Sequence, residues 1–304
     1  MKILVTGGAG FIGSNIVDAY IAAGHEVAIV DNLTTGKKEN LNPKARFYPV
    51  DITDSRLHEV IAEFAPEIIN HHAAQIDVRK SVSDPVFNAK VNELGTLSLL
   101  EAAVKCRIKK IIFASTGGAL YGEVEKKGGA DENYKIEPIS PYAITKRSVE
   151  MYLYAYKQLH GLNYTVLRYG NVYGPRQDPL GEAGVIAIFC GKLLKGEAPT
   201  IYGDGKQLRD YVYVGDVAAA NLLALDKGEG EFFNVGTGKG VSVNELFAVL
   251  KDLLRFDKDA IYAPARAGEL FRSVLSAKKI KREFGWKAGT SIKKGLKLTL
   301  KWYK

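Results

Sequence analysis

The sequence predicts an α/β fold: a doubly wound parallel sheet followed by a smaller C-terminal α/β lobe. Three observations predict it. The chain opens with a strand, a glycine-rich turn, a helix and a second strand within its first 31 residues. Short apolar runs then alternate with helical patterns to about residue 115, an order typical of a parallel sheet with helices on both faces. Beyond residue 170 the pattern loosens into shorter segments rich in Gly and Pro.

The opening elements indicate a dinucleotide site. Lys2–Thr6 is an apolar strand, glycines follow at positions 7, 8, 10 and 13, and the strand Glu26–Val30 ends on Asp31. Glycines let the backbone turn tightly and approach a pyrophosphate, whose charge meets the N-terminus of the next helix. Asp31 lies 18 residues after Gly13, where a carboxylate accepts hydrogen bonds from the adenosine ribose and repels a 2′-phosphate. The pattern predicts a Rossmann site for NAD rather than NADP, against the alternative of a turn whose glycines serve only packing.

The next strands are expected at Arg46–Val50, Ile68–His72 and Ile111–Ala114. Asp84 and Pro85 begin a helix, because Pro suits the first helical position. The residues that this helix is expected to bury are Phe87, Val91, Leu94, Leu97 and Leu100.

Ligands bind outside the carboxyl ends of the strands in such folds. The segments expected to line this crevice are Gly7–Gly13, Asp31, Asp51–Ile52, Ala73–Gln75 and Ser115–Tyr121. His71 and His72 are adjacent in a strand, so they point to opposite faces, and no third ligand accompanies them. We therefore expect no metal site.

The later chain predicts a smaller lobe fed by crossovers from the large sheet. A strand at Tyr164–Leu167 precedes a helix near Val185–Leu194. Short segments follow around Thr200–Tyr202, Asp210–Val214 and Phe232–Val235. We expect residues 1–170 to form the dinucleotide domain, with parts of the later chain crossing back, and residues 171–304 to form mainly the substrate lobe.

Composition and charge exclude several classes of function. The chain has 304 residues, a net charge of +8 and two cysteines without metal spacing. Much of the positive excess lies near the C-terminus, where Ile292, Leu296, Leu300 and Tyr303 share one helical face with lysines between them, as in a solvated surface helix. We therefore expect no nucleic-acid partner. No apolar run reaches the roughly 18 residues of a membrane span, and the first strand leaves no room for a signal peptide, so the expected location is cytoplasmic.

Tyr142 and Lys146 are the candidate catalytic pair. They stand four residues apart at a predicted helix start, after Ser140 and Pro141, and therefore share a helical face. A free tyrosine has a pKa near 10. A neighbouring cation, helped by the positive nicotinamide ring, favours the phenolate, which can then act as a general base on a substrate hydroxyl while hydride leaves for NAD.

Seven motifs, in order and spread over essentially the whole chain, carry a family resemblance. They are TGGAGFIGS (6–14), DNLTTG (31–36), HHAAQIDVRKSVSDP (71–85), STGGALYG (115–122), SPYAITK (140–146), LRYGNVYGPRQ (167–177) and RDYVYVGDV (209–217). With them the chain resembles the extended short-chain dehydrogenase/reductase family, and within it the 4-epimerases of UDP-glucose and UDP-galactose. The resemblance implies a retained NAD that takes a hydride from C4 of a UDP-sugar and returns it to the other face of the rotated 4-keto sugar.

The crevice and the resemblance together predict the site residues. Those expected to bind NAD are Gly7, Gly10, Phe11, Ile12, Gly13, Asp31, Asn32, Asp51, Ile52, Ala73, Ala74, Gln75, Asn92, Tyr142, Lys146 and Tyr169. The resemblance places Asn171 by the sugar-phosphate region, Arg209 and Arg266 on the diphosphate, and Tyr211 and Glu269 by the uridine ribose. Arginine suits a diphosphate because of its forked donors, and surface ion pairing is the alternative for these two.

The chain departs from the family at two positions. Where epimerases carry a Ser or Thr that assists proton transfer stands Gly117, so Thr116, Ser115 or a water must take that role. Gly117 and Gly118 also argue against the sugar 4,6-dehydratases, which need acidic side chains there. The small Ser273 stands where a bulky residue can restrict the pocket to plain hexoses, and so predicts room for an N-acetyl group.

Other functions stay open at this stage. Epimerases of UDP-N-acetylhexosamines or UDP-uronic acids, and a nucleotide-sugar reductase, would keep the same motifs. A redox-sensing binding module would have no need of the tyrosine–lysine pair together with the two arginines. The resemblance also implies a homodimer formed through the helices after Asp84 and Pro141, whose Leu97, Leu100, Met151 and Tyr154 fit an internal core equally well.

Overall fold

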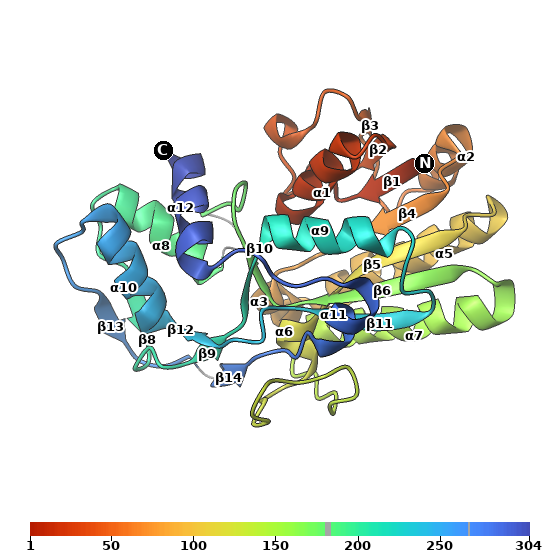
Figure 1. Cartoon of the computed structure of the whole chain (residues 1–304). Coiled ribbons are helices and arrows are strands. Elements are labelled where there is room, and N and C mark those ends of the chain that lie inside the picture. Colours follow the sequence, from red (N-terminus) through yellow and green to blue (C-terminus); the bar gives the residue numbers. More distant parts are fainter. Residues whose placement is uncertain (180–183, 267) are drawn as a thin grey trace.

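The computed structural model describes residues 1–179, 184–266 and 268–304. Within these residues, seven parallel strands form a large sheet (Figure 1). Their order is β11 (Glu231–Val235), β6 (Asn163–Tyr169), β5 (Lys110–Thr116), β4 (Ile68–His71), β1 (Lys2–Thr6), β2 (Glu26–Val30) and β3 (Arg46–Tyr48). The chain runs outward from β1 in both directions, and in such sheets ligands bind outside the carboxyl ends of the strands at this point, here β1 and β4. The predicted fold class is confirmed.

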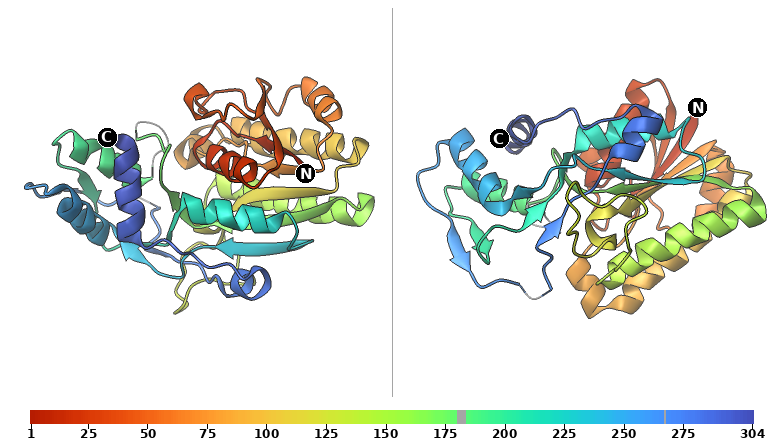
Figure 2. Two further views of the ribbon diagram at one scale, coloured as in Figure 1. Left: turned by 45° about the horizontal axis from the view of Figure 1, so that its top comes forward. Right: turned by 60° about the horizontal axis from the view of Figure 1, so that its bottom comes forward.

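Helices cover both faces of the large sheet, as Figure 2 shows. One face carries α1 (Phe11–Ala22), α9 (Val214–Ala224) and α11 (Lys278–Phe284), and the other carries α2 (Arg56–Phe64), α5 (Gly95–Lys105) and α7 (Pro141–His160). Each face has its own apolar core. Ile112 of β5 belongs to the first core and Ile111 to the second, because successive strand residues point to opposite faces.

The strand bounds differ from the predicted ones mainly at the later chain. The segment Phe232–Val235, expected among the short strands that follow residue 170, lies in β11 at the edge of the large sheet beside β6. β3 ends at Tyr48 rather than Val50, and β4 ends at His71 rather than His72. The chain therefore returns to the large sheet after its excursion into the smaller lobe.

The helix after Asp84 is interrupted by a π turn. Asp84 accepts a hydrogen bond from Phe87 N at 3.0 Å and so caps α4 (Pro85–Ala89), which follows the unpredicted α3 (Val78–Ser83). The π turn at Lys90–Leu94 adds a residue before α5 and rotates the buried face. The expected burial of Phe87 and Leu94 is therefore wrong, since their exposed fractions are 37% and 59%. Leu100 is buried as predicted, and the unpredicted buried residues are Asn88, Asn92, Thr96 and Leu99.

The smaller lobe lies beside the carboxyl ends of the large sheet (Figure 1). Its strands are β7 (Asn171–Tyr173) with β10 (Tyr211–Tyr213), β8 (Thr200–Tyr202) with β13 (Ile261–Ala263), and β9 (Leu208–Arg209) between β12 (Val241–Ser242) and β14 (Arg272–Ser273). The helices α8 (Val185–Leu194), α10 (Val243–Leu254) and α12 (Ile292–Tyr303) enclose a third apolar core. In the described part of the chain, every helix is too short or too polar to cross a bilayer.

Candidate active site

The turn between β1 and α1 is folded too tightly for a side chain at Gly7 or Gly13. Gly7 has φ +70°, and a Cβ on it would lie 2.7 Å from Ala73 N. A Cβ on Gly13 would lie 2.2 Å from Gly7 O. Helix α1 begins after Gly10 with no side-chain cap and no acidic residue in its first turn. The turn thus leaves the positive end of α1 open, which fits the pyrophosphate of a dinucleotide.

Asp31 is held at the end of β2 with both carboxylate oxygens anchored to the backbone. Oδ2 accepts from Ala9 N at 3.0 Å and Oδ1 accepts from Leu33 N at 2.8 Å. Burial raises the pKa of this carboxyl, while the two backbone N–H groups oppose the rise. Each oxygen keeps a lone pair for a ribose hydroxyl. At the neighbouring strand end, Asn32 Nδ2 donates to Asp51 Oδ2 at 2.5 Å. The geometry fits the predicted adenosine end of NAD.

Asn92 and Tyr169, both expected to bind NAD, direct their side chains to partners within the protein. Asn92 Oδ1 accepts a hydrogen bond from Gln75 N at 2.8 Å. Asn92 Nδ2 donates to Gln75 O at 3.0 Å and to Thr145 Oγ1 at 3.1 Å. Tyr169 OH is bonded to His72 Nε2 at 3.1 Å and to the buried Asn221. Asn92 therefore ties the segment after β4 to α7, and its contact with a cofactor stays a prediction, as does that of Tyr169.

Tyr142 and Lys146 occupy the first turns of α7, whose start the sequence specifies. Ser140 Oγ accepts from Ala143 N at 3.2 Å, and Pro141 takes the first helical position. Lys146 is buried, and its Nζ donates to Ala114 O at 2.8 Å. The same Nζ lies 5.9 Å from the centre of the Tyr142 ring. The side chains of Tyr142 and Lys146 therefore lie on the same side of α7, toward the carboxyl end of β5.

Burial opposes the predicted ionisation of this pair. The sequence analysis expected Lys146 together with the positive nicotinamide ring to favour the phenolate, and burial alone raises the pKa of Tyr142 to about 12. Burial also lowers the pKa of Lys146 to about 7, partly offset by the charge of Glu150. Both groups are thus shifted toward their neutral forms, because a buried charge loses its hydration. The pair needs additional positive charge before Tyr142 can serve as a base.

The structure separates the two candidates for the proton-transfer role at β5. Ser115 Oγ donates to Glu150 Oε1 at 2.7 Å, on the face that α7 covers. Its predicted catalytic role is therefore wrong, because its hydroxyl is used inside the protein. Thr116 follows in the strand and points to the other face. A Cβ on Gly118 would lie 4.0 Å from Thr116 Oγ1 and 3.3 Å from Asn171 Oδ1, so both side chains are near this glycine. Thr116 thus stays the candidate.

Gly117 is glycine for a steric reason. A Cβ at this position would lie 2.6 Å from Leu275 Cδ1 and 2.8 Å from Leu275 Cδ2. Leu275 is fully buried in a small cluster with Tyr121 and Val124. The space that a Ser or Thr side chain would need is therefore filled by Leu275.

Strand pairing in the smaller lobe brings the predicted substrate residues together. Asn171 of β7 lies opposite Tyr211 of β10, and Arg209 of β9 lies opposite Ser273 of β14. Arg209 NH2 lies 3.5 Å from Glu269 Oε1. Ser273 Oγ donates to Gly118 O at 3.2 Å, which links β14 to the loop after β5.

Arg266 O accepts a hydrogen bond from Glu269 N at 3.4 Å, but its side chain contacts a residue outside this group. Its guanidinium carbon stacks 3.8 Å from the centre of the Tyr202 ring, and its predicted pairing with a diphosphate stays a prediction. Neither this stacking nor Tyr202 itself was predicted. The pairing of an arginine with an aromatic ring 64 residues away leaves no local signal in the sequence.

A cavity of about 200 Å³ lies beside the paired strands β7 and β10 and the start of α8. Three of its lining residues carry buried polar atoms that have no hydrogen-bond partner among the described residues, namely Asn171 Oδ1, Tyr211 OH and Gln177 Oε1. Unpaired buried polar atoms are costly, so a polar ligand that pairs with them would be bound favourably. The sequence analysis missed Gln177, although it closes the motif LRYGNVYGPRQ that it shares with Asn171.

Comparisons with known proteins agree with this geometry. Residues 3–236 match the family model "NAD dependent epimerase/dehydratase family". The chain is 42% identical to the UDP-glucose 4-epimerase of Mycolicibacterium smegmatis, over 100% of this chain and 99% of that protein. The solved UDP-glucose 4-epimerase of Thermotoga maritima with UDP-glucose matches with a TM-score of 0.98 and 51% identity, covering 100% of this chain and 98% of that one. The Thermus thermophilus UDP-glucose 4-epimerase complex with NAD matches with a TM-score of 0.95 and 47% identity, over 100% and 99%.

A family model that spans 234 of 304 residues, full-length relatives and a matching fold all point the same way. The strand–turn–helix of the predicted dinucleotide site lies inside the matched region. The chain belongs to the NAD dependent epimerase/dehydratase family.

Proposed function

We propose that this protein is an NAD-dependent 4-epimerase that interconverts UDP-glucose and UDP-galactose. The observation that carries the proposal is the buried Lys146, anchored to Ala114 O at the carboxyl end of β5, one helical turn from Tyr142. The names of the similar proteins support the substrate, since UDP-glucose 4-epimerases match over the full chain.

In this proposal Tyr142 exchanges a proton with the C4 hydroxyl of the sugar. When bound, NAD supplies a positively charged ring that accepts the C4 hydrogen with its electron pair and gives it back. Additional positive charge stabilises the phenolate, whose pKa burial alone raises to about 12. Lys146 adds its own charge and is kept in place by Ala114 O. Tyr142 Oη takes the hydroxyl proton in the first half of the reaction and returns it in the second.

The other residues hold the substrate so that the sugar can turn. Arg209, with Glu269 beside it, lies in β9 opposite Ser273 and suits a diphosphate. Asn171 and Tyr211 offer unpaired polar atoms to the part of the substrate that fills their cavity. Holding the nucleotide end and leaving the hexose ring free allows either face of the 4-keto sugar to be presented.

The first test uses the purified protein and UDP-galactose alone, with no added cofactor. The anomeric proton signals are followed by NMR. We expect UDP-glucose to appear, which requires both the epimerase reaction and a retained NAD. If nothing changes, NAD is added, followed by UDP-N-acetylglucosamine, UDP-N-acetylgalactosamine and UDP-glucuronate. A protein inert toward all of them contradicts the proposal, and net consumption of NADH or NADPH identifies a reductase instead.

A second substrate class is favoured by Ser273. This small, buried residue contacts the Gly118 carbonyl beside the predicted sugar site. We expect UDP-galactose and UDP-N-acetylgalactosamine to be turned over at rates within about tenfold of each other, because no bulky side chain excludes the acetyl group. Ser273→Tyr should lower only the rate on the acetylated sugar. A native protein that rejects UDP-N-acetylgalactosamine contradicts this expectation.

We also propose that the protein is a homodimer. Of the four residues considered for an interface, Leu100 is fully buried and Leu97 partly buried, so these two belong to the core. Met151 and Tyr154 on α7 are 61% and 57% exposed. Exposed apolar side chains gathered on one helix support an association surface. Light scattering should give a mass near twice 33.2 kDa, and a concentration-independent monomer contradicts the proposal.

A further inference from the structure

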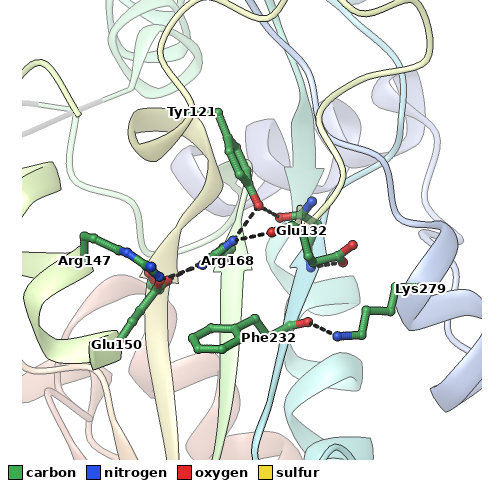
Figure 3. Close-up of polar contacts among 9 residues, drawn as sticks. Tyr121, Glu132, Arg147, Glu150, Arg168, Phe232 and Lys279 are labelled. Atoms are coloured by element: carbon green, nitrogen blue, oxygen red, sulfur yellow. Dashed lines mark hydrogen bonds and ion pairs between the residues drawn. The ribbon is translucent and has the colours of Figure 1, made fainter. Parts of the chain in front are cut away.

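A buried ion pair lies one helical turn beyond Lys146. Glu150 of α7 is 0% exposed and Arg168 of β6 is 2% exposed. Arg168 Nε donates to Glu150 Oε1 at 2.8 Å, and Arg168 NH2 donates to Oε2 at 2.6 Å, so the pair is bidentate (Figure 3). Ser115 Oγ donates to the same Oε1, and Arg147 NH1 donates to Oε2 at 2.9 Å. Four hydrogen bonds from three elements thus converge on one carboxylate.

Arg168 is fixed on its other side as well. Its NH1 donates to Tyr121 OH at 2.9 Å and to Glu132 O at 3.3 Å. Tyr121 OH in turn donates to Asn234 Oδ1 at 2.8 Å. The guanidinium also lies 5.0 Å from the centre of the Phe232 ring. Figure 3 shows these side chains closing around Arg168 from β11 and from the loop after α6. Neither partner of the ion pair can move without disrupting several contacts.

Glu150 continues the stripe of the catalytic pair. Tyr142, Lys146 and Glu150 follow one another at intervals of four on α7, so they share one face of the helix. Lys146 bonds to the carbonyl of Ala114 and Glu150 bonds to the hydroxyl of Ser115, the next residue of β5. Two consecutive residues of one strand therefore set the position of α7 along the sheet.

Among the described residues, the other groups that interact with Lys146 carry no negative charge. The Phe113 ring of β5 lies 4.7 Å from its Nζ, and Tyr142 on its own helix is a neutral phenol at neutral pH. His71 and His72 of the β4 end interact electrostatically with Lys146 and are kept neutral by burial. The charge of Glu150 is the influence that raises the pKa of Lys146 against burial.

We propose that Glu150 is a positioning residue for the reaction: clamped by Arg168, Ser115 and Arg147, it keeps the Lys146 ammonium charged and in place beside Tyr142. The inference rests on the proposed function only through the use of Tyr142 and Lys146. Arg168 fixes the carboxylate from β6, whereas Glu150 stands one turn from Lys146 on the same helix. Because residues four apart on a helix are neighbours, the negative charge of Glu150 acts on Lys146 at short range.

The test is Glu150→Gln, which keeps the size of the side chain and removes its charge. Lys146 then loses its stabilising anion and deprotonates at lower pH. We expect the basic limb of the pH profile of kcat to move down by about one unit, and kcat above that limb to fall about tenfold. KM for UDP-galactose should change less than about twofold. The matched control is Glu101→Gln, because Glu101 also accepts a hydrogen bond from α7, donated by Tyr156 OH at 2.5 Å. This control variant should leave the pH profile of kcat unchanged.

Two further variants separate this role from support of the fold. Ser115→Ala keeps both charges and removes one hydrogen bond, so it should lower the Tm while the basic limb stays in place. Glu150→Gln with Arg168→Gln removes both charges together and leaves no buried charge unpaired. This double variant should still shift the basic limb down by about half a pH unit. It replaces the single variant in the test if Glu150→Gln alone does not fold. An unchanged limb in a folded Glu150→Gln protein, or in the folded double variant, overturns the proposal.

A direct readout keeps this inference distinct from the proposed function. The ¹³Cε signal of Lys146 is assigned with Lys146→Met and titrated by NMR in the native protein and in Glu150→Gln. We expect its pKa to be lower in the variant, with or without epimerase activity. Equal titration of Lys146 in both proteins overturns the inference, whereas a shifted titration in a protein that does not act on UDP-galactose leaves it standing and removes only the proposed function.

Discussion

Replacing Tyr142 with phenylalanine is expected to lower kcat for UDP-galactose epimerisation by about 10²- to 10⁴-fold, the usual contribution of a general acid–base group. The ring stays in place at the start of α7, held by Ser140 and by the hydrogen bond from its own backbone N–H to Ser81 Oγ at 3.2 Å. Only the hydroxyl that takes the C4 proton is lost. The measurement is the rate of appearance of UDP-glucose by NMR at saturating substrate.

The matched control is Tyr152→Phe, which removes a hydroxyl from an exposed position on the same helix. Its activity should equal that of the native protein. Both variants should have the native Tm, because within the described residues neither the Tyr142 nor the Tyr152 hydroxyl makes a hydrogen bond that the substitution would remove. A Tyr142→Phe protein that keeps more than a tenth of the native kcat assigns the proton transfer to another group, with Thr116 as the next to test.

Acidification below pH 6.5 is expected to destabilise the fold through His71 and His72. His71 is buried between Thr6 Oγ1 at 2.7 Å and Thr96 Oγ1 at 2.9 Å, and burial holds its pKa well below 6.5. Burial lowers the pKa of His72 to about 3. The unfolded chain therefore binds more protons than the folded one in this range, so the free energy of unfolding falls as the pH falls. Each histidine contributes up to about 1.4 kcal/mol per pH unit.

The measurement is urea unfolding of the native protein at pH 7, 6, 5 and 4.5. His72→Gln should reduce the slope of stability against pH below 6.5 by about one proton, because one of the two suppressed titrations is gone. His58→Gln is the matched control: His58 is exposed on α2 and should leave the slope unchanged. A slope that His72→Gln does not alter means that His72 is protonated in the folded protein.

Local patterns predicted the parts of the molecule whose contacts are near in sequence. The glycine turn, β1, β2 and the start of α7 follow from residues within a few positions of one another. Tyr142 and Lys146 could be placed on one face because a helix repeats regularly. For the same reason α8 was predicted at its observed bounds, Val185–Leu194.

Errors arose where a distant contact decides the outcome. The π turn at Lys90–Leu94 has no clear local signal, and it shifts the buried face from Leu94 to Leu99. Ser115 was taken as catalytic because its orientation toward Glu150, 35 residues later, could not be seen in the sequence. The same holds for β11, which pairs with β6 across more than 60 residues, and for the pairings of Asn171 with Tyr211 and of Arg209 with Ser273.

The contact between Gly117 and Leu275 couples two positions that lie 158 residues apart in the chain. A serine introduced at 117 alone meets the Leu275 side chain, and an alanine introduced at 275 alone leaves a void in a buried cluster. Each single substitution therefore lowers the stability of the folded protein. The two substitutions together replace the volume of the leucine side chain with that of the serine side chain. Evolution from glycine to serine or threonine at position 117 therefore requires a change at position 275 as well. Whichever substitution comes first carries the cost, so the order of the two substitutions limits this evolutionary path.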